Sequence, residues 1–542
     1  MLLVALLALL AGCTAAPPQQ ARPVPAQPPN IVMIMTDDQW LDSMRFMPRT
    51  QQLFGTEGVT FDHYYASFPL CCPSRSTFLS GQFAHNNGVR HNADPLGGYD
   101  HLNEAETLPV WLQRAGYTTS HIGKYPNGYG KDDPTHVPPG WNEWRGSTDP
   151  STYNMYGYQL NENGQLHTYG DYWHEDPKNY QTDVYRDKGV DFINRQAPTG
   201  RPFFLSMAFL APHGEQTPGA PNNGDLFRIG PGPRPALRHK GAFADLPLPA
   251  DPSYNEADMS DKPQFLRDYP DITPAERAGI TESYRARAES LLAVDEAVQK
   301  LVDTLRATGA LQNTYVVFAS DNGFFFGQHK VPTGKFLPHE TSGHVPMMVL
   351  GPGLARGQHS AELTENTDLP ATIAEMAGAK PGLTVDGRSV LPFAQDPRRR
   401  TGRPILHEAA AGALPRPIRP GQRIPADDRS SGAAAGAGDL DQDGPAAAPR
   451  GKRGPAPLDE HGQVLSAAYE AIRTERYLYI RYLTGAHELY DLSVDPYELN
   501  SRHKDARYAE VRRFLDRRLD ELQGCAGAAC NRDIPPAPKA PA

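Results

Sequence analysis

Acidic and amide side chains stand directly behind two apolar runs of the chain. The run 30–35 is followed by a threonine and two aspartates, and the run 315–319 by a serine, an aspartate and an asparagine. Such runs are typical of buried strands, and ligands gather at the carboxyl ends of strands in open α/β sheets. Converging carboxylates repel one another unless a cation lies between them, and hard oxygen ligands suit calcium or magnesium. We therefore predict a Ca²⁺ site, with Mg²⁺ as the alternative, whose ligands are Asp37, Asp38, Asp321 and Asn322.

The first residues of the chain have the composition of a targeting segment. An apolar run from Leu2 to Leu10 is too short to span a bilayer and is typical of a signal-peptide core. The small residues before Cys13 resemble the bacterial lipobox, which implies lipidation of Cys13 after a signal peptide, 1–13, with the Pro-rich residues 14–29 as a tether. The alternative is an ordinary secretory signal cut near Ala15. Both predict an exported protein, either secreted or lipid-anchored through Cys13 to the outer face of a bacterial cell membrane.

The remaining cysteines divide into two pairs. Cys525 and Cys530 enclose a short loop of small residues that closes easily in an oxidising compartment, and we expect a disulfide between them. Cys71 and Cys72 are adjacent and can bridge each other only with strain. Two cysteines left unpaired in an exported protein suggest chemistry.

The composition excludes several classes of protein. In 542 residues, 53 prolines and 49 glycines make a loop-rich chain. Their share stays below the range of about 25–30% that marks low-complexity chains, which excludes collagen, coiled coil and wholesale disorder. The net charge of −10, without a basic stripe, argues against nucleic acid as a partner.

Short apolar runs alternate with helical patterns through the middle of the chain. We expect strands at 30–35, 117–122, 202–210 and 315–319, and helices at 108–115, 274–308 and 364–378. This alternation predicts an α/β fold over residues 30–405, with a mostly parallel sheet sandwiched by helices. Residues 411–462 lack periodicity and are typical of a disordered insertion. Strands at 477–483 and 488–491 and a helix at 505–523 predict a smaller C-terminal α+β subdomain, 406–525, followed by a tail, 526–542.

The segment Cys71-Cys72-Pro73-Ser74-Arg75 resembles the C-x-P-S-R signature of the type I sulfatases. The resemblance implies an alkaline-phosphatase-like fold. It also implies that a formylglycine-generating enzyme oxidises Cys71, and not Cys72, to Cα-formylglycine (3-oxoalanine). The resemblance covers residues 29–525, because four further segments are similar to family segments: 122–125, 211–213, 321–323 with 333–335, and 488–491 with 495–499.

The resemblance implies hydrolysis of a sulfate ester at the strand ends. The hydrated aldehyde at position 71 would attack sulfur and bind the cation, with Asp321 as the base. Two lysines would neutralise the sulfuryl group, a histidine would protonate the departing alcohol, and an arginine would orient the formylglycine. The implied catalytic residues are Cys71, Arg75, Lys124, His213 and Lys335, and the implied substrate-binding residues are Lys124, His213, His329 and Lys335.

Within the family, the double cysteine, the segment 123–127 and Pro138-Pro-Gly-Trp141 look most like the glucosamine-6-sulfatase branch. The expected substrate is therefore a sulfated carbohydrate of the N-acetylglucosamine-6-sulfate type. Phe324-Phe-Phe326 and His344 depart from the family pattern around the substrate pocket or its support. Three alternatives stay open: an arylsulfatase, a phosphonate or phosphate-ester hydrolase on the same fold, and a surface lipoprotein that binds sulfated glycans without turnover.

Overall fold

The computed structural model describes residues 27–216, 232–409 and 468–540. The expected signal peptide with Cys13, most of the expected tether and the expected insertion 411–462 lie outside these residues. Among the described helices, none has both the length and the apolar character needed to cross a membrane.

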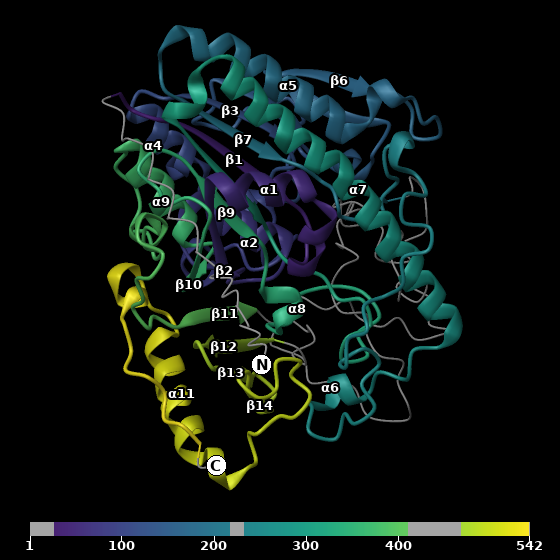
Figure 1. The fold of residues 1–542 in the computed structure, drawn as a ribbon, viewed down its shortest axis with the longest axis vertical. Helices are drawn as coiled ribbons and strands as arrows, with labels where there is room; N and C mark the ends of the chain where they lie inside the picture. The colour runs from purple at the N-terminus through teal and green to yellow at the C-terminus, as the bar shows by residue number, and fades with distance from the viewer. Residues whose placement is uncertain (1–26, 217–231, 410–467, 541–542) are drawn as a thin grey trace, which may run out of the picture.

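A ten-stranded sheet forms the centre of the molecule (Figure 1). Its strands lie in the order β10-β2-β9-β8-β1-β7-β3-β4-β5-β6. The central strands β8, β1, β7, β3 and β4 are parallel, whereas β9, β5 and β6 pair antiparallel with their neighbours. The strand bounds are β1 Asn30–Thr36, β2 Gly58–Tyr65, β3 Thr118–Gly123, β4 Glu143–Ser147, β5 Tyr158–Glu162, β6 Gln165–Tyr169, β7 Phe203–Ala208, β8 Thr314–Ser320, β9 Met347–Leu350 and β10 Gln358–Glu365.

Strand β1 is buried on both faces, and its alternate side chains enter two separate cores. Val32 and Ile34 pack with residues of α1, α5 and α7, while Ile31, Met33 and Met35 pack with residues of α2, α4 and α9. Figure 1 shows α5 and α7 on one side of the sheet and α4 and α9 on the other. The predicted α/β sandwich is confirmed. The helix bounds are α1 Pro48–Glu57, α2 Cys71–Ser80, α3 Ala84–Asn87, α4 Leu108–Arg114, α5 Gln181–Gln196, α6 Gln264–Arg267, α7 Pro274–Ala307, α8 Glu340–Gly343, α9 Asp368–Ala377, α10 Leu391–Gln395 and α11 Ala509–Leu522.

Local signals in the sequence explain where the longest helix begins. Thr273 and Glu276 form a capping box in which each side chain satisfies a backbone N–H of the other, and Pro274 takes the first helical position. The apolar face of α7, which contains Leu291, Val294, Val298, Leu301 and Leu305, is buried. α9 ends at Gly378, whose φ of 63° is the left-handed conformation that glycine adopts without strain.

A four-stranded antiparallel sheet follows the large one. It contains β11 Ile405–Ala409, β12 Tyr469–Arg473, β13 Tyr477–Tyr482 and β14 His487–Asp491. One face packs on α11, and the other packs on the loop after β8 that contains Phe325, Phe336 and Leu337. Tyr469 Oη donates a hydrogen bond to the Phe336 carbonyl at 2.6 Å. The small sheet therefore holds the loop that carries Lys335.

The C-terminal end of the chain is tied back to the large domain. Cys525 and Cys530 are joined in a disulfide directly after α11. The Cys525 carbonyl accepts hydrogen bonds from the Asn86 amide at 2.7 Å and from the His85 ring at 2.9 Å. The bridge thus holds a tight loop against α3.

Candidate active site

Neighbouring strand ends bring the two acidic segments together. β1 and β8 pair in parallel with Thr36 opposite Ser320, so Asp37 and Asp321 follow equivalent positions at one edge of the sheet. β7 runs parallel to β1 on its other side, and the turn that carries His213 follows at the same edge.

Cys71 is the first residue of α2, so the N-terminus of a helix meets this edge. The free N–H groups and the dipole of a helix N-terminus favour an anion nearby. Cys71 Sγ lies 3.3 Å from Asp37 Oδ1 and 2.8 Å from Lys335 Nζ. One turn on, Ser74 Oγ donates to the Asp321 carbonyl at 2.6 Å, which fixes α2 against the end of β8.

Cys72 lies in a different environment from Cys71. Its backbone N–H donates to Asn92 Oδ1 at 2.9 Å, and its Sγ lies 4.0 Å from the Asn127 carbonyl. Cys72 also belongs to the apolar core formed with α4 and α9. Of the two adjacent cysteines, Cys71 is therefore the one within the acidic group.

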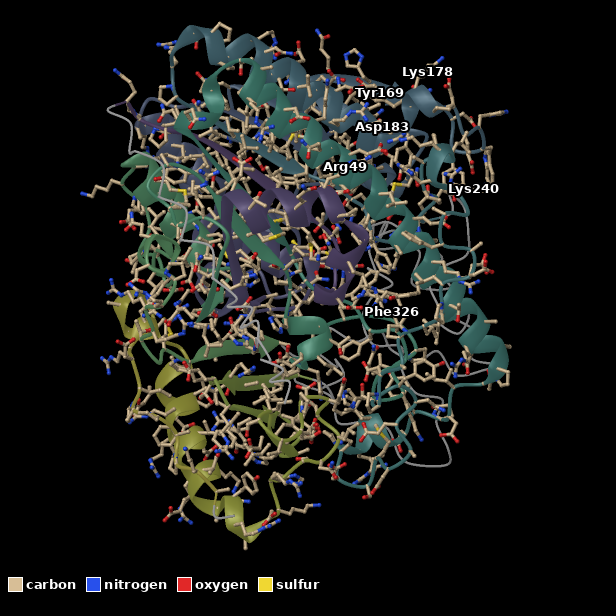
Figure 2. The ribbon with its side chains drawn as sticks, viewed as in Figure 1. Arg49, Tyr169, Lys178, Asp183, Lys240 and Phe326 are labelled. Carbon is tan, nitrogen blue, oxygen red and sulfur yellow. A yellow bond between two sulfur atoms is a disulfide. The ribbon has the colours of Figure 1, made fainter. Side chains whose placement is uncertain are left out.

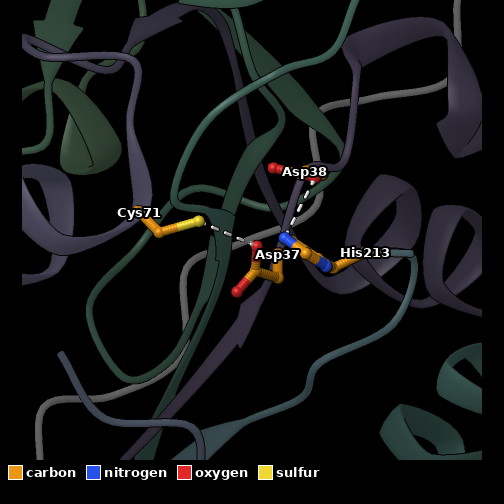
Figure 3. A group of neighbouring side chains, drawn as sticks. All are labelled: Asp37, Asp38, Cys71 and His213. Carbon is orange, nitrogen blue, oxygen red and sulfur yellow. Dashed lines mark hydrogen bonds and ion pairs between the residues drawn. The ribbon is translucent and has the colours of Figure 1, made fainter. Parts of the chain in front are cut away.

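Four side chains of the site could share one metal ion. The potential ligand atoms of Asp37, Asp38, Cys71 and His213 all lie within 4.8 Å of one another, and all four residues are buried (Figure 3). His213 Nε2 is 3.7 Å from Asp38 Oδ2. The sequence predicted metal ligands with oxygen donors together with position 71, and the structure adds His213 to this group.

The other two predicted ligands border this group. Asp321 Oδ1 accepts the backbone N–H of Asp38 at 3.2 Å, and Asn322 Nδ2 donates to Asp38 Oδ1 at 2.6 Å. Asn322 Oδ1 is buried and has no hydrogen-bond partner among the described residues. A buried amide oxygen left unsatisfied beside carboxylates is the kind of ligand that a hard cation takes. The donor set therefore fits calcium or magnesium.

Four cationic side chains neutralise three aspartates in this site. All seven are at most 3% exposed. Because the positive charges outnumber the negative ones even before a cation is counted, the site suits an anion. The contacts are Arg75 with Asp37 (2.7 Å) and Asp321 (2.8 Å), Lys124 with Asp37 (2.7 Å), and Lys335 (2.5 Å) and Arg287 (3.3 Å) with Asp38.

The same charges give Asp37 and Asp321 different pKa values. Burial raises the pKa of Asp37, but the Lys124 and Arg75 charges outweigh it and hold the pKa below its ordinary value. Burial and the neighbouring Asp37 raise the pKa of Asp321 to about 6, against the lowering effect of Arg75. Two carboxylates that share one arginine thus differ in their affinity for a proton.

The hydrogen bonding of His213 defines which ring nitrogen can exchange a proton. Nδ1 lies 2.7 Å from the Gly214 carbonyl, which can only accept, so Nδ1 carries a hydrogen. Nε2 is then the atom that gains or loses a proton, and it faces Asp38. The His213 ring packs against Tyr153 at 5.1 Å between centroids, and Lys124 Nζ lies 4.6 Å from the centroid of the same Tyr153 ring.

Sequence reasoning missed two residues that support the site. Tyr153 holds both His213 and Lys124, and its hydroxyl accepts the Asn127 amide at 2.6 Å. No sequence signal marks it. Arg287 donates to Asp38 and to the Pro212 carbonyl at 3.1 Å. An arginine on the apolar face of α7, with its guanidinium fully enclosed, could have been noticed from the helical periodicity.

His329 has partners other than the cysteine group. Its Nδ1 lies 2.7 Å from Glu256 Oε2, and its Nε2 lies 3.9 Å from Glu498 Oε2. Burial lowers the pKa of His329, but the two carboxylates outweigh it and raise the pKa to about 9. In this arrangement both ring nitrogens face carboxylates, so the predicted contact between His329 and sulfate would need one of these pairs to open.

The chain matches the family model described as Sulfatase over residues 29–379. It is 34% identical over 378 residues to human N-acetylglucosamine-6-sulfatase, which covers 67% of this chain and 64% of that protein. It is 34% identical over 372 residues to the extracellular sulfatase SULF-1 homolog of Drosophila melanogaster (67% and 31%) and over 375 residues to the arylsulfatase of Volvox carteri (65% and 56%). The chain therefore spans less than two thirds of the length of these relatives.

Solved structures share the fold. BT4656, in complex with its substrate D-glucosamine-2-N,6-O-disulfate, superposes with a TM-score of 0.68 at 22% identity and covers 92% of this chain and 98% of that one. The phosphonate monoester hydrolase SpPMH from Silicibacter pomeroyi superposes with a TM-score of 0.58 at 18% identity and covers 93% and 96%. Because the region that matches the family model contains the whole ten-stranded sheet, Cys71 and both acidic strand ends, this chain belongs to the sulfatase family.

Proposed function

We propose that this protein removes sulfate from a sulfated carbohydrate of the N-acetylglucosamine-6-sulfate type, with Cα-formylglycine made from Cys71 and one divalent cation. The observation that carries the proposal is the position of Cys71 Sγ, 3.3 Å from Asp37 Oδ1 and 2.8 Å from Lys335 Nζ. A nucleophile at this position has an acidic metal-ligand group on one side and a fixed ammonium on the other.

The residues that would hold the cation are the oxygen donors of the two strand ends, joined by position 71. A bound Ca²⁺ or Mg²⁺ would supply positive charge that acidifies a hydroxyl and polarises the sulfate. The unsatisfied Asn322 Oδ1 supports this assignment. The proposed ligands are Asp37, Asp38, Asp321, Asn322 and the modified residue 71.

The charged side chains bind and orient the reacting groups. The hydrated aldehyde would supply geminal hydroxyls at position 71, one of them as the nucleophile. Arg75, which bonds both Asp37 and Asp321, would keep these carboxylates in register with position 71. Asp321 is the base expected from the sequence, and Asp37 is a second candidate because it is in contact with Cys71.

Three further side chains would act on the sulfate ester itself. Lys124 and Lys335 would neutralise the charge of the sulfuryl group, because both ammonium groups are buried and held by aspartates. His213 would donate the proton on Nε2 to the departing alcohol oxygen, since its Nδ1 is already committed to the Gly214 carbonyl. The Tyr153 ring contacts both His213, the proposed acid, and Lys124, and so would fix the position of one relative to the other.

The cellular context follows from the same proposal. Two relatives are named extracellular sulfatases, which supports export of this chain. A formylglycine-generating enzyme would be its partner during maturation, and a sulfated glycan its partner in turnover. Contact with a membrane would occur only through a lipid on Cys13.

A phosphonate or phosphate monoesterase is a second candidate, favoured by one observation. SpPMH, a phosphonate monoester hydrolase, shares the fold over nearly the whole length of both chains. Against this candidate, only one group of side chains among the described residues could hold a metal ion. A phosphate dianion needs more neutralising charge than a sulfate monoanion.

The test is release of inorganic sulfate from N-acetylglucosamine 6-sulfate by protein made together with a formylglycine-generating enzyme. Phosphate release from the matching 6-phosphate, and release of the alcohol from a phenylphosphonate monoester, are measured in parallel. Faster phosphate release would favour the second candidate. Turnover of aryl sulfates alone would keep the sulfatase and remove the sugar assignment, and binding of sulfated glycans without any release would favour the lipoprotein.

A further inference from the structure

The turn that carries His213 is held on both sides of the histidine. Directly before it, Arg287 donates to the Pro212 carbonyl at 3.1 Å. Two residues after it, Glu215 is a buried carboxylate, 5% exposed. A buried carboxylate costs free energy unless hydrogen bonds and an opposite charge compensate it. The partners of Glu215 therefore show which parts of the fold it joins.

The first partners of Glu215 lie on the loop that contains Tyr153. Glu215 Oε1 accepts the backbone N–H of Met155 at 2.7 Å, and the next backbone N–H, that of Gln216, donates to the Tyr153 carbonyl at 3.2 Å. These two hydrogen bonds join the same two segments as the contact between the rings of His213 and Tyr153. Because the rings are carried by these backbones, Glu215 helps to set the position of His213 against Tyr153.

Arg234 holds the carboxylate of Glu215 from the other side. Its Nε donates to Oε2 at 2.7 Å, its Nη2 donates to Oε1 at 2.8 Å, and its backbone N–H donates to Oε2 at 2.9 Å. Two parallel N–H···O bonds between a guanidinium and a carboxylate fix the direction of the carboxylate as well as its position. Glu215 thus has one defined orientation between Arg234 and Met155.

The segment that carries Arg234 is itself anchored to two helices. Arg238, four residues later, contacts Asp183 of α5 at 2.5 Å and Glu296 of α7 at 2.7 Å. Asp183 is labelled in Figure 2. Arg234 also donates to the Tyr172 carbonyl at 2.6 Å. The anchor of Glu215 is therefore attached to helices that pack on the central sheet.

Tyr153 and Lys124 have supports that do not involve Glu215. The side-chain amide of Gln181, the first residue of α5, donates to the Thr152 and Asn154 carbonyls at 2.9 Å each. Lys124 Nζ lies 2.7 Å from Asp37 Oδ2. Loss of the Glu215 contacts should therefore displace the His213 turn more than it displaces the Tyr153 ring or the ammonium of Lys124.

From these contacts we infer that Glu215 is a positioning residue for His213, which it holds where Nε2 can reach the oxygen of the departing alcohol. The inference rests on the proposed function, in which His213 is the acid. Glu215 acts through the backbone of the turn and through Arg234. A displacement of about 1 Å at an acid can cost about 100-fold in rate, so a residue outside the reacting group can affect one step strongly.

The experiment measures kcat of Glu215→Gln on N-acetylglucosamine 6-sulfate and on an aryl sulfate. Glutamine keeps the size of the side chain but loses the charge that pairs with Arg234. Because only the alkyl alcohol depends strongly on an acid, kcat for the sugar sulfate should fall about 10- to 100-fold, while kcat for the aryl sulfate stays within about 3-fold. In the His213→Ala background, the same change should alter either rate by less than about 2-fold. Unchanged kcat for the sugar sulfate, equal losses on both substrates, or a full further loss without the histidine would overturn the inference.

The matched control is Asp368→Asn, at another buried carboxylate that accepts two backbone N–H groups and pairs with an arginine. Its partners are the backbones of Glu365 (3.0 Å) and Arg388 (2.8 Å) and the guanidinium of Arg403 (2.8 Å). Asp368 belongs to α9, on the face of the sheet opposite α5 and α7 (Figure 1). A general loss of stability in this variant should change the two rates in parallel.

Arg234→Lys tests the same contact if Glu215→Gln does not fold. Lysine keeps the charge but not the paired N–H groups, so the selective loss on the sugar sulfate should be about 3- to 10-fold. An unchanged ratio of the two rates in the folded Arg234→Lys protein would overturn the inference.

A spectroscopic measurement separates this inference from the proposed function, because it needs no turnover. In protein labelled with ¹⁵N-histidine, the ring signals of His213 are those that His213→Ala lacks. Glu215→Gln should shift the Nε2 signal, since Nε2 faces Asp38, and Asp368→Asn should leave it in place. If the wild type released no sulfate, the proposed function would fail and this signal would still decide whether Glu215 positions His213. Sulfate release by the wild type, with an unmoved signal in Glu215→Gln, would overturn the inference alone.

Discussion

Lys335 Nζ lies 2.8 Å from Cys71 Sγ and 2.5 Å from Asp38 Oδ1, and its side chain is fully buried. One ammonium group therefore contacts the proposed nucleophile position and a proposed metal ligand at once. Because a buried ammonium needs compensating charge, the position of this side chain depends on both partners. The centre behaves as one charged unit, and changes at any member should be felt at the others.

The first prediction concerns the two cysteines. Protein made together with a formylglycine-generating enzyme should show, at Cys71, the mass loss that corresponds to replacement of the thiol by an aldehyde oxygen. Cys71→Ala should be inactive, whereas Cys72→Ala, a change in the apolar core, should keep the modification and much of the activity. Peptide mass spectrometry with a sulfate-release assay checks both. Full activity with an unmodified Cys71 would refute the mechanism.

The second prediction concerns the cation. Asp37→Asn should lower activity by at least about 10- to 100-fold, since it alters a ligand in a charged cluster. Chelator treatment should have a similar effect, with rescue by calcium, and calcium should raise the unfolding temperature of the wild type but not of the variant. Asp191→Asn, at an exposed ion pair, is the control. Metal-free protein that retains full activity would dismiss the site.

The third prediction concerns His213 as the acid. An alkyl alcohol leaves poorly because its conjugate base is strong, whereas an aryl alcohol needs less help. His213→Ala should therefore slow sulfate release from N-acetylglucosamine 6-sulfate far more than release from an aryl sulfate, by about 10²- to 10⁴-fold for the sugar. Steady-state kinetics on both substrates give the comparison. Equal losses would mean that His213 serves binding or the metal instead.

The fourth prediction concerns Arg287, which contacts Asp38 and the Pro212 carbonyl from α7. Arg287→Met leaves a buried carboxylate with one partner fewer, and it should lower the free energy of unfolding by about 3 kcal/mol. It should also change calcium affinity, measured by calorimetry. The control is Arg285→Met. Arg285 lies two positions before Arg287 on α7, and this change removes its hydrogen bond to the Leu246 carbonyl. If a folded Arg287→Met protein bound calcium with unchanged affinity, the role of Arg287 would be packing alone and not support of the metal site.

The fifth prediction concerns pH. His329 has a pKa of about 9 in the folded protein against an ordinary value of 6.5, so its charge stabilises the fold fully below about pH 6.5. This contribution, up to about 3 kcal/mol, should be lost as the pH rises through 9. Thermal unfolding at pH 7.5 and pH 10 should show a larger drop for the wild type than for His329→Gln, with exposed His174→Gln as control. A changed KM with an unchanged pH profile would support sulfate contact instead.

The sequence was sufficient to predict the strands and helices that depend on a local signal, such as an apolar run or a helix cap. Asn30–Thr36 and Thr314–Ser320 have apolar centres and are buried throughout, and their parallel pairing puts Asp37 and Asp321 side by side. The helix from Pro274 was predictable because capping and periodicity agree. Strands such as β4–β6 were not expected, because they are short and rich in polar residues and resemble loops until the neighbouring strand is known.

The sequence selected residues that the structure brings together at the site, but it could not predict which of them contact one another. The resemblance to family segments selected Cys71, Lys124 and Lys335, but a segment match cannot give the charge balance of a buried group. Tyr153 supports two functional side chains through its ring, and that role depends on a turn whose course only tertiary packing decides. His329 shows the converse: a segment match selected it, while its carboxylate partners come from distant loops.

The hydrogen bond from Tyr469 to the Phe336 carbonyl, described with the small sheet, has a consequence for the order of events in a newly made chain. The residues that clamp the Lys335 loop are translated long after the loop itself and after Cys71. Until they emerge, the loop that carries Lys335 lacks this hydrogen bond and the apolar packing of the small sheet. Cys71 is fully enclosed once folding is complete. If Cys71 is modified as proposed, the modifying enzyme therefore has to act before the last strands are added.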